Sequence, residues 1–160
     1  MRAIVVPTVV WALSLGSAGC GSASDEEAKA GRVGATTTRR IIVEAADYTF
    51  PQLPDTLDPG PVIFRLRNSG RVRHELNLVL LRPGVTVARA LDAARGQGDP
   101  TQTLERDLGL LVALPASSSR DSLAVDLQSG RTYAVACFLK DAPNAPEHVV
   151  MGMAGGFYVR

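Results

Sequence analysis

The stretch PVIFRLRNSGRVRHELNLVLL, residues 61–81, decides the fold. In its first half Val62, Phe64 and Leu66 alternate with residues that are mostly charged. This period of two is typical of a β-strand with one buried face. The run Asn68-Ser69-Gly70 then predicts a turn. The stretch therefore predicts two consecutive strands.

The second of these strands carries a histidine at its start. His74 shares one face with Leu76, Leu78 and Leu80, and the other face holds Glu75, Asn77, Val79 and Leu81. Because successive side chains of a strand point to opposite sides, we expect His74 at the start of the more apolar face.

Strand patterns recur on both sides of this stretch. They are Ile41-Ile42-Val43, the alternation over 123–127, that over 133–139, and Phe157-Tyr158-Val159. Proline and glycine clusters separate them and break regular structure. Six to eight short strands indicate an all-β fold, a β-sandwich.

One helical insertion, at about 86–114, interrupts the strands. Thr86 is a predicted N-cap for a short helix that runs to about Arg95, with Ala88, Leu91 and Ala94 on one face. The rest of the insertion, 101–114, is ambiguous, since Leu104, Leu108 and Leu111 could also share one face of a further helical turn or two.

The first twenty residues have the layout of a secretory signal. Arg2 precedes an apolar run over 3–15, which is too short to span a bilayer, and small residues follow up to Cys20. The segment resembles a bacterial lipoprotein signal, although Ser17 stands where Leu is usual. The resemblance implies cleavage before Cys20 and its diacylation; the alternative is an ordinary secretory signal with an incidental cysteine.

The domain organisation follows from this. We expect a signal peptide at 1–19, a lipid-anchored flexible linker at 20–39 rich in small residues, and one folded domain at 40–160. The mature protein is then exported and anchored to a membrane on the periplasmic or extracellular side.

Charge and missing motifs exclude several functions. The net charge is +1, and loss of Arg2 leaves equal numbers of basic and acidic residues, so no nucleic-acid partner is expected. There is no Gly-x-Ser-x-Gly turn, phosphate-binding loop, dinucleotide fingerprint or Cys-x-x-Cys pair. We therefore expect no enzymatic activity.

The chain has few residues that bind soft metals, and they form a recognisable set. His74 and His148 are the only histidines, Cys137 is the only cysteine in the domain, and Met151 and Met153 follow His148 closely. Two imidazoles, one thiolate and a weak thioether are the ligands of a blue-copper site. Each residue also has a structural reading: a strand-end histidine, a small buried thiol, an exposed loop histidine, and methionines that fill the core.

The order of these residues resembles the cupredoxin family. The residues that carry the resemblance are Asp47-Tyr48-Thr49-Phe50, Asn68-Ser69-Gly70, His74-Glu75-Leu76, Gly130, Tyr133 to Phe138, His148, Gly152-Met153 and Phe157-Tyr158-Val159. The resemblance covers roughly 41–160. It implies a Greek-key β-sandwich and one type 1 copper ion.

Taken residue by residue, the resemblance implies four copper ligands. His74 is the first imidazole, Cys137 the thiolate and His148 the second imidazole, while Met153 is the axial thioether. Two positions depart from the family pattern: Glu75 stands where Asn is frequent, and ten residues separate Cys137 from His148.

Three functions are compatible with this resemblance. The first is one-electron transfer by a membrane-tethered copper protein. The second is copper handling, which needs a more exposed site and a mobile loop. The third is a metal-free interaction module, in which the 86–114 insertion is the contact surface. The first two imply a redox or copper-handling partner protein in the cell envelope.

Overall fold

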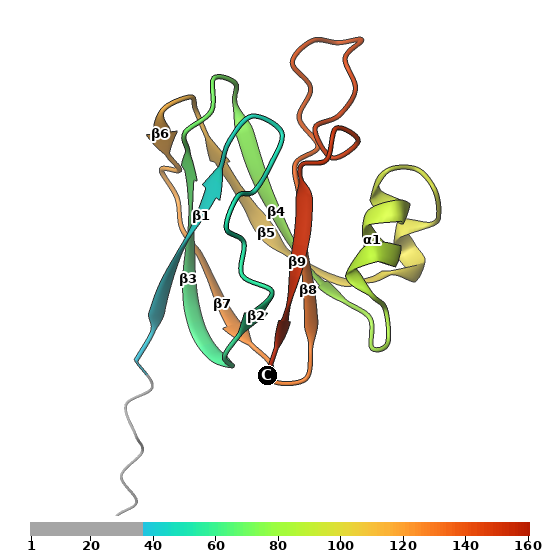
Figure 1. Ribbon diagram of the computed structural model, residues 1–160. Coiled ribbons are helices and arrows are strands. Elements are labelled where there is room, and N and C mark those ends of the chain that lie inside the picture. Colours follow the sequence, from blue (N-terminus) through green and yellow to red (C-terminus); the bar gives the residue numbers. More distant parts are fainter. Residues whose placement is uncertain (1–36) are drawn as a thin grey trace, which may run out of the picture. The chain divides into compact units, whose positions relative to one another are not determined.

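The computed structural model describes residues 37–160, which form two β-sheets and a short helical insertion (Figure 1). The strands are β1 (Arg39–Ala45), β2 (Thr56–Leu57), β3 (Gly60–Asn68), β4 (His74–Leu81), β5 (Leu104–Ala113), β6 (Ser117–Ser118), β7 (Leu123–Leu127), β8 (Thr132–Ala136) and β9 (Ala154–Val159). The helical elements are α1 (Val87–Ala94) and the 3-10 turn η1 (Pro100–Gln102). Neither is long and apolar enough to cross a membrane. The predicted signal peptide, Cys20 and most of the predicted linker lie outside the described residues.

The two sheets have different pairings. In the first, β3 lies between β1, which runs parallel to it, and β6 and β7, which run antiparallel. In the second, the order is β2-β9-β8-β4-β5, and all pairs except β2–β9 are antiparallel. The fold is the expected all-β sandwich.

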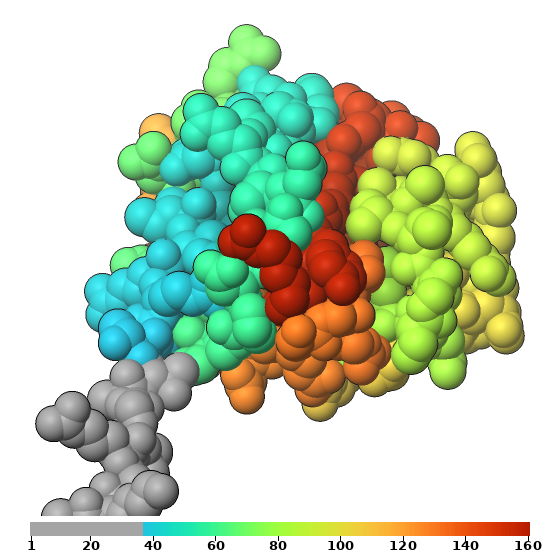
Figure 2. All heavy atoms as spheres, turned by 60° about the horizontal axis from the view of Figure 1, so that its bottom comes forward, coloured from blue at the N-terminus to red at the C-terminus, as the bar shows by residue number. Residues whose placement is uncertain are grey.

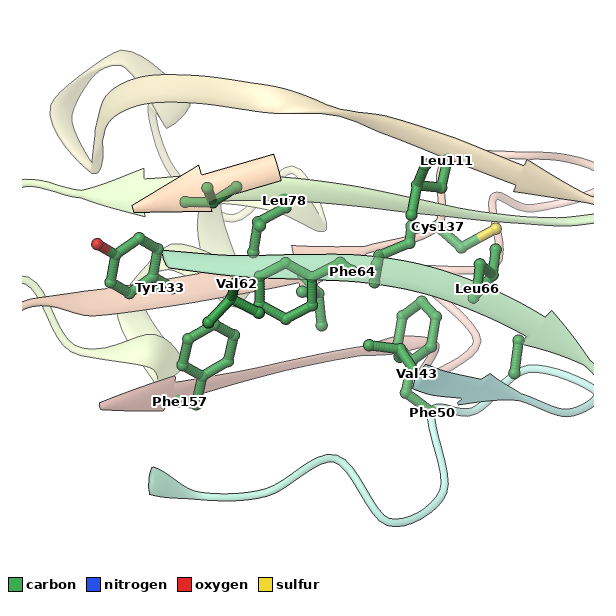
Figure 3. Packing of buried hydrophobic residues seen from close by; sticks show 14 of the residues in the cluster. Val43, Phe50, Val62, Phe64, Leu66, Leu78, Leu111, Tyr133, Cys137 and Phe157 are labelled. Carbon is green, nitrogen blue, oxygen red and sulfur yellow. The ribbon is translucent and has the colours of Figure 1, made fainter. Parts of the chain in front are cut away.

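The core fills the space between the sheets. The alternating residues Val62, Phe64 and Leu66 of β3 are at most 1% exposed, as their pattern predicts. Phe64 faces Phe157 of β9 at 6.1 Å between ring centroids, and Phe157 stacks on Tyr133 of β8 at 5.2 Å. Figure 3 shows Tyr133 at one end of this core and Cys137 at the other. The buried cysteine is thus part of the core, at its edge.

The insertion is helical only in its first part. Thr86 caps α1 by accepting a hydrogen bond from the backbone N–H of Arg89, as predicted. The yellow-green atoms of the insertion form one side of the molecule (Figure 2). Most of the ambiguous stretch 101–114 is the strand β5 (Leu104–Ala113) and not a second helix, while its first two residues end the 3-10 turn η1. There Leu104 packs on a small outer cluster with Leu81, whereas Leu108 and Leu111 pack on the main core.

Three strands of the second sheet place the site. β4 begins at His74, β8 ends at Ala136 just before Cys137, and β9 begins at Ala154 just after Met153. Because β4 and β9 both run antiparallel to β8, these ends meet at one pole of the sandwich. The long β8–β9 loop rises above this pole at the top of Figure 1.

Candidate metal centre

His74, Cys137 and His148 come together at this pole. Their ligand atoms all lie within 4.8 Å of one another. His74 Nδ1 lies 3.2 Å from His148 Nδ1, and Cys137 Sγ lies 3.3 Å from the same nitrogen. All three residues are 0% exposed. The structure thus brings residues 74 positions apart in the sequence into one buried cluster.

The spacing of the two imidazoles suits one metal ion. Nitrogens that each bind a first-row ion at about 2.0 Å lie about 3.3–3.5 Å apart in a tetrahedral or trigonal set. The observed separation of 3.2 Å is close to this value. Neither ring needs to move far for both nitrogens to reach the same ion.

An aspartate determines which nitrogen of His148 carries the proton. Asp141 Oδ1 lies 3.0 Å from His148 Nε2. A carboxylate accepts hydrogen bonds only, so Nε2–H is the donor and Nδ1 keeps its lone pair. A carboxylate on the far nitrogen is the usual support of a metal-binding histidine.

His74 also turns its Nδ1 toward the cluster, but the carboxylate near its Nε2 is farther away than the one near His148. Its Nε2 is the one buried side-chain nitrogen or oxygen among residues 37–160 without a hydrogen-bond partner. Asp47 Oδ1 lies 3.8 Å from it, beyond hydrogen-bond distance. A nearby carboxylate favours the proton on this nitrogen, which again leaves the lone pair on Nδ1.

Two lone pairs therefore face each other in a buried place. His74 Nδ1 and His148 Nδ1 repel one another at 3.2 Å unless a proton or a cation lies between them. With Cys137 Sγ beside them, the three donors form the set that soft transition metals bind. The donor set fits a copper ion.

Glu75 contacts both the Cys137 thiol and the backbone of the next residue. Its backbone N–H donates to Cys137 Sγ at 3.4 Å, and its carboxylate Oε1 accepts from the backbone N–H of Phe138 at 2.9 Å. Glu75 is buried, with 9% exposure. The residue that departs from the family pattern thus fixes the backbone around Cys137.

Backbone hydrogen bonds bring the long loop back to the site. The N–H of His148 donates to the carbonyl of Leu139, and the N–H of Val149 donates to that of Cys137. The intervening residues 140–147 form a closed excursion, so the extra length does not displace His148.

Backbone hydrogen bonds hold Met153 beside the cluster. Its N–H donates to the carbonyl of His148, and its carbonyl accepts from the N–H of Cys137. The side chain is 0% exposed, whereas that of Met151 is 41% exposed. Of the two methionines, Met153 is the one whose side chain is buried at this pole.

Burial and neighbouring groups shift the pKa values of the cluster in different directions. Burial lowers the pKa of His74, and His148 acts in the same direction, so the imidazole stays neutral. Burial raises the pKa of the Cys137 thiol, which must lose its proton to bind a metal. The hydrogen bond from Tyr48 is the main cause of the lowered pKa of Asp141, which remains ionised.

The structure therefore brings together three of the four predicted ligands and places the backbone of the fourth beside them. Cys20, the predicted lipid site, lies outside the described residues. Asp141 and Tyr48 also lie at the site, although no sequence pattern predicts a role for either of them. The segment between Cys137 and His148 holds two carboxylates, Asp141 and Glu147, so the sequence alone does not single out Asp141.

Solved structures with the same fold are known. Auracyanin B matches with a TM-score of 0.51 and 22% identity over 80% of this chain and 93% of that chain. Dithionite-reduced auracyanin from Roseiflexus castenholzii matches with a TM-score of 0.50 and 18% identity over 77% of this chain and 98% of that one. No protein-family model matches the sequence, and neither does any curated protein. The structural matches confirm the expected cupredoxin fold.

Proposed function

We propose that this protein transfers single electrons through one copper ion in a type 1 site formed by His74, Cys137, His148 and Met153. The observation that carries the proposal is the convergence of two imidazole Nδ1 atoms and a thiol in a buried cluster. Each imidazole has a carboxylate near its far nitrogen, at 3.8 Å from His74 and 3.0 Å from His148.

The donor chemistry supports copper over harder ions. Thiolate and thioether ligands favour Cu(I), and imidazole accepts both copper oxidation states. Copper bound there would supply the Cu(I)/Cu(II) couple. The chain's own contribution is to hold the donors in one arrangement through the sheet ends, the Glu75 contacts and the loop hydrogen bonds.

Burial favours electron transfer over copper handling. A protein that passes copper on needs a ligand that a partner can approach. Here His74, Cys137, His148 and Met153 are all 0% exposed. An electron can cross a thin layer of protein, whereas an ion cannot leave this site without an opening of the loop.

Replacement of His148 by Ala tests the proposed site. We expect the affinity for copper to fall by more than about a hundredfold, because a ligand is lost and Asp141 has nothing left to orient. The measurement is competition with a chelator of known affinity, with Met151→Leu as the matched control because Met151 is exposed. An unchanged affinity in H148A would refute the site, whereas a wild type that does not bind copper would favour the metal-free module.

The proposed location is the cell envelope. The signal-like segment 1–19 and Cys20 support an exported protein that is lipid-anchored on the periplasmic or extracellular side. A redox protein of the same compartment is then the proposed partner.

A further inference from the structure

A turn of the chain covers both imidazoles. Ala46 and Thr49 form an isolated antiparallel bridge, and Asp47 and Tyr48 occupy the turn between them. Tyr48 has a φ of 63°, a left-handed conformation that costs a non-glycine residue free energy. Such a conformation persists where other contacts hold the residue in place.

The Tyr48 side chain makes those contacts at the site. Its ring packs edge-on against His148, with ring centroids 5.1 Å apart and planes at 81°. Its hydroxyl donates to Asp141 Oδ2 at 2.6 Å. The other oxygen of the same carboxylate accepts from His148 Nε2 at 3.0 Å. A chain of two hydrogen bonds thus runs from the phenol to the imidazole.

We propose that Tyr48 is a positioning residue that raises the reduction potential of the copper centre by drawing charge away from the Asp141 carboxylate. The inference rests on the proposed function and adds to it a residue that is not a ligand. Tyr48 lies 93 positions from Asp141 and 100 from His148 in the sequence, so only the fold brings the three together.

The direction follows from competition for one carboxylate. A carboxylate that accepts from the Nε2–H of a metal-binding histidine makes the ligand nitrogen more basic, which stabilises the higher oxidation state. The phenol O–H engages the same carboxylate and weakens its pull on the imidazole proton. Hydrogen bonds around the ligands are a recognised means of tuning a metal's potential.

Two single variants should shift the potential in opposite directions. Tyr48→Phe keeps the ring on His148 but frees Asp141, so the potential falls. Asp141→Asn keeps an oxygen acceptor without the charge, so the potential rises. A general loosening of the site does not predict opposite signs. In the double variant the effect of Tyr48→Phe should vanish, because the carboxylate through which it acts is gone.

The test is a redox titration of the copper-loaded full chain in detergent, in which the visible absorption of the protein reports the fraction of oxidised copper. Tyr158→Phe is the matched control, because Tyr158 is 46% exposed and pairs with Thr132 at the far end of β9 from the site. Equal potentials in the wild type and Y48F, or shifts of the same sign in Y48F and D141N, would overturn the proposal.

A second readout does not need copper. In the copper-free chain, proton NMR of the His148 Nε2–H should show a downfield shift in Y48F and an upfield shift in D141N. A chain that binds no copper refutes the proposed function and the tuning of a potential with it, but still shows these shifts. A chain that binds copper without them refutes the Tyr48 proposal alone.

Discussion

Replacing Cys137 by Ser is expected to remove the intense visible absorption of the copper-loaded protein almost completely. The band of a blue-copper site comes from charge transfer between the thiolate and the metal, and a hydroxyl cannot replace a thiolate in this role. The fold should survive, since Ser is nearly the same size and can accept the hydrogen bond from the Glu75 N–H that Sγ now accepts. The cost in stability should be about 1 kcal/mol.

Cys20→Ala is the matched control for this prediction. Cys20 and Cys137 are the only cysteines of the chain, so one of them must supply any thiolate within a single copy. C20A should keep the band, and circular dichroism of C137S should match the wild type. A band that persists in C137S, or that is lost in C20A, would contradict the assignment of Cys137.

The second large effect concerns the core and not the metal. Replacing Phe157 by Ala should lower the free energy of unfolding by about 3–5 kcal/mol, the usual cost of a large cavity left by a buried aromatic ring. Phe157 is 1% exposed and packs against both Tyr133 and Phe64, so its loss removes one aromatic contact between the two sheets and leaves a cavity in the core. The whole free energy of unfolding of a single domain is only about 5–15 kcal/mol, so this loss is a large fraction of it.

The adjacent residue supplies the control. Tyr158 follows Phe157 on β9 but points to the other side of the sheet and is 46% exposed. Tyr158→Ala should change the free energy of unfolding by less than about 1 kcal/mol. Urea titrations of the copper-free chain expressed from Gly21 measure both, and similar losses in the two variants would contradict the packing described here.

Much of the fold was predictable because the strands alternate cleanly. Val62, Phe64 and Leu66 mark the buried face of β3, and the structure confirms it. The stretch 104–113 was not predictable because its register is irregular. The β4–β5 pairing shifts twice, and Gly109 has a φ of 135°, so Leu104 and Leu108 lie on different sides despite their helix-like spacing.

Of the candidate site, only the metal-ligand residues were predictable from the sequence. His74, Cys137 and His148 stand out because each type is rare in the chain and each lies at a strand end or in the loop between strands. The residues that contact His148 beyond the ligands, Tyr48 and Asp141, could not be recognised in the sequence in this way. Neither tyrosine nor aspartate belongs to the ligand set of a blue-copper site, and the hydrogen bond between Tyr48 and Asp141 joins loops 93 residues apart. Only the closed fold shows that they act on His148.

The visible absorption spectrum of the full chain with Cu(II) tests the central claim most directly. The account predicts an intense thiolate-to-copper band that grows up to one equivalent of copper and no further, and that disappears on reduction. A folded protein with a reduced Cys137 that stays colourless at one equivalent of Cu(II) would contradict it. The domain would then be a cupredoxin-shaped module without a type 1 copper site.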